Sequence, residues 1–478
     1  MPDGTESKPD EVAPPPSPPD APAVPSPSAL SPEQASSSLK YSVKDGCAHA
    51  VMLGTGEASL SPFAIFLKAD DMLLGLLTTL PNWLGSLIQI AAVRLLGSSR
   101  RRKLFVTVPV FIQALVWVPL AALPLAALHF GYAREAPLLL LACALVYFSL
   151  GGFVVPAWNS WMGDVVPPDG RGVYFARRDR FRLIFQLAAM LAAGRLLDQT
   201  RSWGAVGWGF AAVFGVALVA RLFSVRYLRK MDEPPPQPLA EEERFTFLQF
   251  LRRTPKSNFG RFAIFQALFL STTGLAGPFF APFMLRDLGL SYMEYTAIGA
   301  TFVLFQVLTL PAWGRIGDRY GNRRILVVTS LLISFLPTFW SLSTWYPYLV
   351  AFQVLGGSMW AGFSLASFNF FFDAVTPAKR VRCVAYYNTL VAFAVLLGGV
   401  AGGWLAPRLP CSIEFFGLAV LPLVSPLQVL FILSGLLRLL VTVFFLRAIR
   451  EAREVEKGGW REILQSFFGE APPREREP

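Results

Sequence analysis

Charged residues are scarce in this sequence. Only 16% of its 478 residues are Asp, Glu, Lys or Arg, whereas 54% are hydrophobic and the mean hydropathy is +0.47. Soluble domains carry roughly 25% charged residues, which cover their water-facing surface. The chain therefore lacks the polar side chains that a soluble body needs, and most of its surface is expected to face lipid.

Residues that bind metals or carry acid–base chemistry are also few. The four cysteines stand far apart, and the two histidines, His49 and His129, fall near expected helix ends. Neither a disulfide framework nor a metal site is expected, and no cofactor is expected. The chain has no Gly-rich phosphate loop followed by Lys and Ser or Thr, which disfavours an ATP-driven pump.

The apolar runs predict an all-α integral membrane protein with twelve transmembrane helices. Each crossing needs ~20 residues, and the runs are long enough. We expect helices near residues 47–67, 72–96, 104–128, 136–162, 178–198, 204–226, 259–284, 291–313, 324–342, 346–372, 382–405 and 424–447.

Composition changes divide the chain into five parts. Residues 1–46 are rich in Pro and Ser, which predicts a disordered tail without a secretory signal. Residues 47–228 and 259–448 are expected to form two six-helix bundles, joined by a polar linker at 229–258 that contains an amphipathic segment. Residues 449–478 are predicted to form an amphipathic tail on the membrane surface.

Lys and Arg predict the orientation in the membrane. They gather in alternate loops, from Arg100–Lys103 to Lys379–Arg382, whereas the other loops hold few of them. Cytoplasmic loops carry this excess, so both termini are expected to be cytoplasmic, in a cell inner membrane. The net charge of +11 thus reflects topology, and nucleic acid is not an expected partner.

The two halves repeat each other. The string D-x-x-x-P-x-x-R begins at Asp164 and again at Asp373, each time where a helix is expected to end. Ser61-Pro62-Phe63 in the first helix resembles Ala281-Pro282-Phe283 in the seventh. These matches at corresponding places indicate a duplicated unit, so the two bundles are expected to be pseudo-symmetric.

One loop carries a family motif. The run from Gly314 to Arg324, GRIGDRYGNRR, is similar to the G-x-x-x-D-R-x-G-x-R-R loop of major facilitator superfamily transporters. The resemblance covers about residues 45–450 and implies alternating access of two bundles around a midplane site. The matching loop after the second helix departs from the pattern, because Arg94 stands where the family has Asp. That departure, with the lack of an arginine in the fourth helix after Arg134 and of a Gly-Pro pair in the fifth, places drug:proton antiport below other substrates.

The resemblance also implies a cytoplasmic gate. The arginines of the motif can reach the carboxylate of Asp373, and Asp164 with Arg171 is the matching pair in the first half. The full set of candidate gate residues is Gly314, Asp318, Arg319, Gly321, Arg323, Arg324, Asp164, Arg171, Asp373 and Arg380.

Glu57 is the acid that falls deepest in an expected helix. A carboxylate at the bilayer centre costs a few kcal/mol or more, and protonation relieves that cost. Glu57 is therefore the candidate ion-coupling group, with H⁺ or another cation as the ion. The alternative is a structural hydrogen bond to a neighbouring helix.

Uncharged polar residues fall at similar depth on several helices. In a transporter of this architecture they line a central cavity, where amides and hydroxyls orient a solute, although each of them could instead join two helices. The candidate substrate-binding residues are Asn82, Gln89, Gln186, Gln266, Thr272, Gln306, Trp360 and Asn388.

Three functions remain in consideration. We expect a secondary active transporter, a monomer in contact with membrane lipids, which moves an unidentified small solute. The alternative is a transporter-like sensor or lipid-handling protein that binds a ligand without turnover. An integral-membrane enzyme ranks third, because the sequence offers no paired catalytic acids and no histidine relay.

Overall fold

The computed structural model describes residues 30–96, 101–130, 135–167, 171–234, 247–253, 257–375, 380–410, 412–415, 418–445 and 449–451. Most of the predicted disordered tail, Cys411 and nearly all of the predicted amphipathic tail lie outside these residues. We refer to the described residues before 235 as the N-terminal half, and to those from 257 onward as the C-terminal half.

The N-terminal half is helical throughout. Its first long segment changes type midway, where a π-helical turn connects two α-helices. The elements are α1 (Pro32–Met52), η1 (Leu53–Glu57), α2 (Ala58–Phe66), α3 (Asp71–Leu96), α4 (Arg102–Phe130), α5 (Ala136–Val165), α6 (Arg171–Ser202) and α7 (Val206–Arg229). The short helix α8 (Phe247–Arg253) lies in the expected linker.

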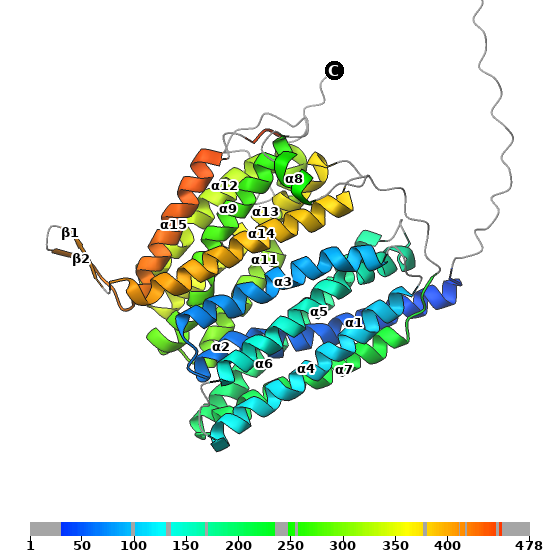
Figure 1. Ribbon diagram of the computed structural model, residues 1–478, viewed down its shortest axis with the longest axis horizontal. Helices are drawn as coiled ribbons and strands as arrows, with labels where there is room; N and C mark the ends of the chain where they lie inside the picture. The colour runs from blue at the N-terminus through cyan, green and yellow to red at the C-terminus, as the bar shows by residue number, and fades with distance from the viewer. Residues whose placement is uncertain are drawn as a thin grey trace, which may run out of the picture.

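The C-terminal half is helical apart from one hairpin. Its elements are α9 (Asn258–Ala276), η4 (Gly277–Phe279), α10 (Phe280–Pro282), η5 (Phe283–Asp287), α11 (Tyr292–Tyr320), α12 (Asn322–Trp340), α13 (Tyr346–Ala374), α14 (Arg380–Leu405), η7 (Ala406–Arg408), β1 (Ser412–Phe415), β2 (Leu418–Pro422) and α15 (Pro426–Phe445). The strands pair antiparallel, with Ser412 opposite Pro422. The all-α prediction is therefore wrong for this loop, which projects at the end of the molecule opposite α8 (Figure 1).

The first helix begins earlier than the apolar pattern predicts. It starts at Pro32 rather than near residue 47, so residues 32–46 are not a disordered tail. Ser31 caps the helix, because its side chain accepts a hydrogen bond from the Gln34 backbone N–H while the Gln34 side chain bonds back to Ser31. Ser42 and Asp45 are nevertheless buried, at 0% and 4% exposure. The polar part of this helix packs against protein, which hydropathy does not reveal.

Each half has its own apolar cores, and the two halves lie side by side (Figure 1). Helix α14 lies between α9 and α3 and reaches both through glycines. A Cβ at Gly398 would stand 1.9 Å from the Ser271 carbonyl oxygen, and one at Gly399 would stand 2.6 Å from the Thr79 side chain. The small residues of this helix therefore serve close packing.

Within the described residues, ten helices are long and apolar enough to cross a membrane. The two long segments outside that set are α1 with its continuation through η1 and α2, and α6. Both carry polar or charged residues over much of their length, and the mean hydropathy of an 18-residue window falls accordingly.

Candidate functional site

Glu57 lies at the end of the π-helical turn η1, where the first long helix changes its winding. Two glycines allow this turn to pack tightly: a Cβ at Gly54 would stand 2.5 Å from the Gln186 carbonyl oxygen, and one at Gly56 would stand 2.5 Å from the Trp117 ring. The Tyr147 hydroxyl donates a 2.5 Å hydrogen bond to Glu57 Oε1. Turns of this type recur at functional sites, and here one fixes a half-buried acid inside the helix bundle.

A chain of hydrogen bonds continues from Tyr147 along the interior. Gln113 Nε2 donates to the Tyr147 carbonyl oxygen at 2.8 Å, and Arg221 donates to the Gln113 amide oxygen. Arg221 Nη1 lies 3.3 Å from Ser224 Oγ. Arg221 is only 5% exposed, so this cation is buried in the N-terminal half and held by neutral groups.

This series of hydrogen bonds ends at a second buried acid, Asp45. Its Oδ1 accepts a 2.6 Å hydrogen bond from Ser224, and its Oδ2 lies 3.6 Å from Arg178 Nη2. Asp45 and Glu57 lie on the same long helical segment, roughly 18 Å apart at 1.5 Å per residue. Glu57 is therefore not the only acid that packs inside the N-terminal half. The sequence predicts that Asp45 lies in the disordered tail, because nothing in its spacing from Glu57 indicates that it is buried.

The candidate substrate-binding residues differ in what they contact. Trp360 lines a cavity of about 210 Å³ in the C-terminal half. Gln266 is buried and bonds Ser367, which joins α9 to α13. Asn82 and Thr272 bond carbonyl oxygens of their own helices. The other four are half-buried and are not among the residues that line this cavity: Gln89, Gln186, Gln306 and Asn388.

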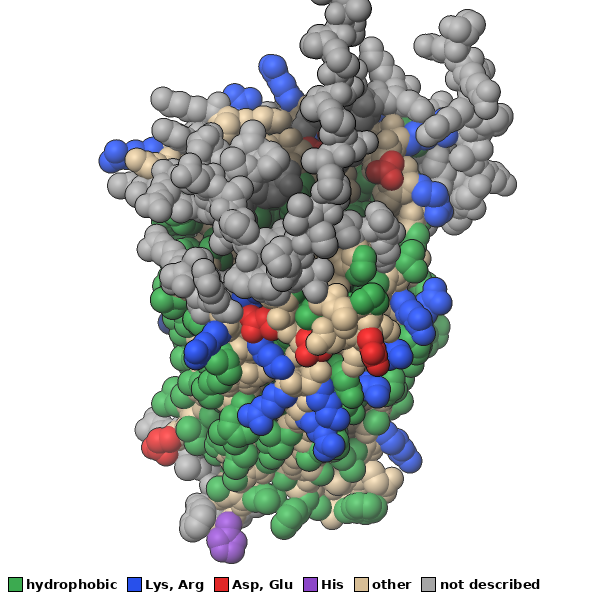
Figure 2. All heavy atoms as spheres, turned by 90° about the vertical axis from the view of Figure 1, so that its right-hand side faces the viewer, with side chains coloured by type: hydrophobic (Ala, Val, Ile, Leu, Met, Phe, Trp, Pro, Cys, Tyr) green, Lys and Arg blue, Asp and Glu red, His purple; other side chains and the backbone are tan. Residues whose placement is uncertain are grey.

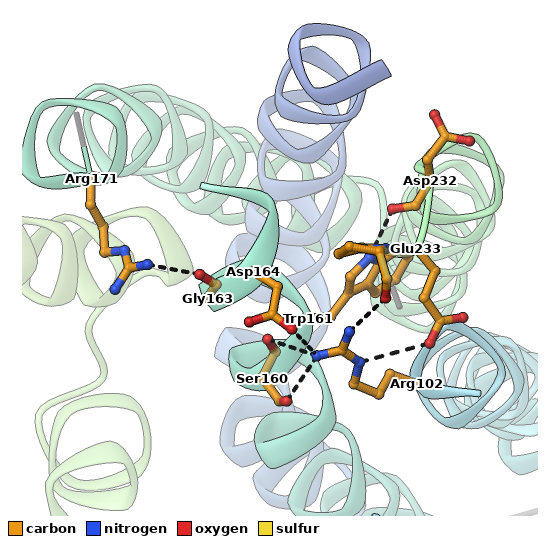
Figure 3. A network of polar contacts seen from close by, with 9 residues as sticks. Arg102, Ser160, Trp161, Gly163, Asp164, Arg171, Asp232 and Glu233 are labelled. Carbon is orange, nitrogen blue, oxygen red and sulfur yellow. Dashed lines mark hydrogen bonds and ion pairs between the residues drawn. The ribbon is translucent and has the colours of Figure 1, made fainter. Parts of the chain in front are cut away.

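Arg102 joins three segments at the end of the N-terminal half where α4 and α6 begin (Figure 3). Its Nη1 lies 2.6 Å from Asp164 Oδ2, and its Nη2 donates to the Pro234 carbonyl oxygen at 2.8 Å. Arg171 instead donates to the Gly163 carbonyl oxygen at 2.7 Å. The expected pairing of Asp164 with Arg171 is therefore wrong: the buried partner of Asp164 is Arg102, at the start of α4.

In the C-terminal half, the corresponding aspartate, Asp373, contacts the residue at the start of α12. Asn322 begins α12 as Arg102 begins α4, and its Nδ2 donates to Asp373 Oδ2 at 3.1 Å. Arg323 bonds the Ile449 carbonyl oxygen through Nε at 2.6 Å, and Glu451 accepts its backbone N–H at 2.7 Å. The arginine thereby binds the segment that follows α15.

The other residues of the expected gate are distributed around this end. Gly321 separates α11 from α12 with φ +88°, a backbone angle that favours glycine. A Cβ added at Gly314 would have only Leu365 within 4 Å. Asp318 is exposed. The Arg319 guanidinium lies 5.3 Å from the Tyr320 ring centre. Arg324 is half-buried in the first turn of α12, whereas the Arg380 side chain lies outside the described part of the chain.

The opposite end of the bundle holds contacts that sequence reasoning missed. Both carboxylate oxygens of Asp198, near the end of α6, accept backbone N–H groups at 2.8 Å, from Tyr292 and Met293 at the start of α11. Arg286 pairs with Asp71 at 2.9 Å. Each contact joins the N-terminal to the C-terminal half, so the two halves are closed against each other at this end.

A family model and curated relatives match this chain. Residues 262–473 match the Major Facilitator Superfamily model. Multidrug export protein EmrB of Haemophilus influenzae is 22% identical over 135 residues, which are 28% of this chain and 26% of that protein. Multidrug resistance protein 2 of Bacillus subtilis is 27% identical over 165 residues, or 34% of this chain and 40% of that protein. The matches thus span less than half of these relatives.

Solved structures share the fold over most of the chain. A variant of the nucleoside transporter NupG has a TM-score of 0.67 at 13% identity, covering 87% of this chain and 100% of that one. A D-xylose-proton symporter has a TM-score of 0.62 at 13% identity, covering 88% and 99%. These relatives are transporters and not enzymes. Together with the apolar helices, the matches show a multi-pass membrane protein whose C-terminal half is similar to the Major Facilitator Superfamily and whose fold is that of these transporters.

Proposed function

We propose that this chain is a secondary active transporter that moves a small solute by alternating access, with Glu57 coupling the movement to H⁺ or another cation. The observation that carries the proposal is the position of Glu57 in the π-helical turn, 2.5 Å from the Tyr147 hydroxyl. A half-buried acid held by a hydroxyl can change its protonation when the hydration of the site changes.

The proposed topology has twelve membrane crossings in two pseudo-symmetric bundles of six. It counts α6, and α1 with its continuation through η1 and α2, as crossings besides the ten apolar helices. Their polar residues support this, because Asp45, Arg178 and Ser224 satisfy one another inside the N-terminal half and need not face lipid. We propose a monomer for this arrangement, in contact with membrane lipids.

The proposed orientation places both termini in the cytoplasm of a cell whose inner membrane holds the protein. Lys and Arg side chains gather over the face at which α1 and α4 begin (Figure 2). Exposed cations there include Arg101, Arg226 and Lys230. In this orientation the contacts of Asp198 and Asp71 lie on the external side, and the described state is the one closed to the outside.

The cytoplasmic gate is proposed in a revised form. Arg102 with Asp164, and Asn322 with Asp373, hold the corresponding helix ends within each half. In the state closed to the cytoplasm, the exposed Asp318 is the group that makes the contact between the halves. Asp318 is suited to accept backbone N–H groups of a helix start, as Asp198 does on the opposite face.

The names of the similar proteins do not agree on one solute. Two curated relatives are named for multidrug export or resistance, and the solved neighbours for nucleoside and D-xylose transport. These names differ in chemistry, and the departure at Arg94 from the family loop still places drug antiport behind other solutes. Transport of a small polar or amphipathic solute is the common element.

Counterflow in proteoliposomes tests transport itself. Liposomes that hold the purified full chain are preloaded with one unlabelled solute from a panel of nucleosides, sugars, carboxylates and quinolones. Transient uptake of the same labelled solute, absent from empty liposomes, supports the proposal. A solute that raises the melting temperature of the protein without any counterflow contradicts transport and favours a sensor that binds without turnover.

A further inference from the structure

The cavity beside Trp360 lies within the C-terminal half of the protein. Its lining comes from α9 to α13 and from α15, and its volume is about 210 Å³. Much of the wall is aromatic, with Phe302, Trp340 and Trp360 among the lining residues. The polar groups of the lining include Thr273, Gln353 and Arg438. The cavity therefore combines an apolar body with a cationic end.

Arg438 is a buried cation with little to neutralise it. The residue is 3% exposed, its Nη1 reaches only the Ile333 carbonyl oxygen at 3.4 Å, and its Nε has no hydrogen-bond partner. No Asp or Glu is among the described residues that line the cavity. Burying a charge without a counter-ion costs several kcal/mol, so this site favours an anion.

The repeat within the chain shows what the C-terminal half has lost. Arg221 on α7 is the counterpart of Arg438 on α15; its two terminal nitrogens bond Ser224 and Gln113, while its Nε, like that of Arg438, has no hydrogen-bond partner. The repeated string that begins at Asp164 and Asp373 places Gly356 at the position of Tyr147.

The repeated Pro-Phe strings likewise place Gly277 at the position of Glu57. Both glycines line the cavity. The space that an acid and a phenol fill in the N-terminal half is therefore empty here, although the arginine has been kept.

We propose that this cavity binds a small amphipathic monocarboxylate. The carboxylate pairs with the Nε edge of Arg438, and the apolar part lies against Phe302, Trp340 and Trp360. One guanidinium matches one planar carboxylate, whereas a phosphate carries more charge and needs further donors. The volume lies below the ~300–1,000 Å³ of pockets for drug-sized ligands, so the ligand is small. This proposal does not depend on transport, because ligand binding is measured on the purified protein without any solute flux.

Titration of the purified full chain with benzoate tests the site, by calorimetry and by the fluorescence of the tryptophans. Benzamide, which has the same shape without the charge, and inorganic phosphate are titrated in parallel. We expect benzoate to bind at least tenfold more tightly than either. Equal binding of benzoate and benzamide would overturn the proposal, as would preference for phosphate or the absence of benzoate binding.

Two variants locate the ligand, and a third is the control. Arg438→Gln removes the cation, and Gly356→Leu fills the cavity while leaving Arg438 in place; a Cβ at Gly356 meets its nearest atoms at ordinary distances of 3.4 Å and more. Each should weaken benzoate binding at least tenfold, whereas Arg195→Gln, at an exposed arginine, should not change it. Benzoate binding that survives Gly356→Leu overturns the assignment even where Arg438→Gln does not fold.

Discussion

Asp198→Asn should open the face at which the two halves meet. In the described state the carboxylate accepts two backbone N–H groups at the start of α11, from Tyr292 and Met293, each at 2.8 Å. The first N–H groups of a helix have no partner within the helix, and its N-terminus attracts negative charge. The amide keeps one accepting oxygen, presents an NH₂ group to the other N–H and loses the charge.

The structure sets the size of this effect. A hydrogen bond to a charged group contributes about 1.5–3 kcal/mol, and a charge at a helix N-terminus adds about 0.3–1 kcal/mol at a partly exposed site. Losing one bond and the charge should cost the closed face about 2 kcal/mol. Since 1.4 kcal/mol is tenfold in an equilibrium constant, the ratio of closed to open molecules should fall roughly 30-fold.

Spin labels on the two halves can measure this ratio. Trp203 and Trp345 are 69% and 68% exposed, lie in loops of different halves and can be replaced by labelled cysteine in a chain without its native cysteines. The variant should shift the distance distribution between the labels toward longer values. The control is Asp179→Asn on the same helix, because Asp179 is exposed and its salt bridge, to Arg182 at 3.0 Å, lies within α6. An unchanged distribution in Asp198→Asn would refute the clamp.

Three further predictions concern topology, the buried cation and packing. Cys411 should react with an impermeant thiol reagent added outside intact cells, whereas labelling only after permeabilisation would reverse the proposed orientation. Arg102→Gln should destabilise the protein by about 3–5 kcal/mol, because it leaves the charge of Asp164 without its cation. Its melting temperature should fall far more than that of the control Arg177→Gln, at an exposed arginine. Gly54→Ala should lower the melting temperature, since its Cβ would stand 2.5 Å from a backbone oxygen, whereas Gly215→Ala, with nothing within 4 Å, should raise it slightly.

Helix positions followed from the sequence more closely than helix ends. The apolar runs locate most of the long helices because length and hydropathy determine which segments can cross a membrane. The start at Pro32 was missed because Ser42 and Asp45 are polar and yet buried. Their partners come from α6 and α7, far along the chain, and no local pattern reveals such a pairing.

The sequence reveals some residues of the candidate sites and not others. Glu57 was found because an acid inside an apolar run stands out. Asp198 and Arg438 were missed because an acid or arginine near the end of an apolar run also fits an ordinary loop or membrane-surface residue. Their significance depends on what faces them: a helix start from the other half for Asp198, and an aromatic cavity for Arg438.

Proton movement in proteoliposomes tests the central claim most directly. A pH-sensitive dye inside the liposomes reports H⁺ entry when a solute that shows counterflow is added outside. The account predicts that the wild-type chain and the exposed-site control Glu33→Gln acidify or alkalinise the lumen, whereas Glu57→Gln exchanges solute without moving H⁺. Solute-driven H⁺ movement that persists in Glu57→Gln would contradict the assignment and leave Glu57 as a structural partner of Tyr147.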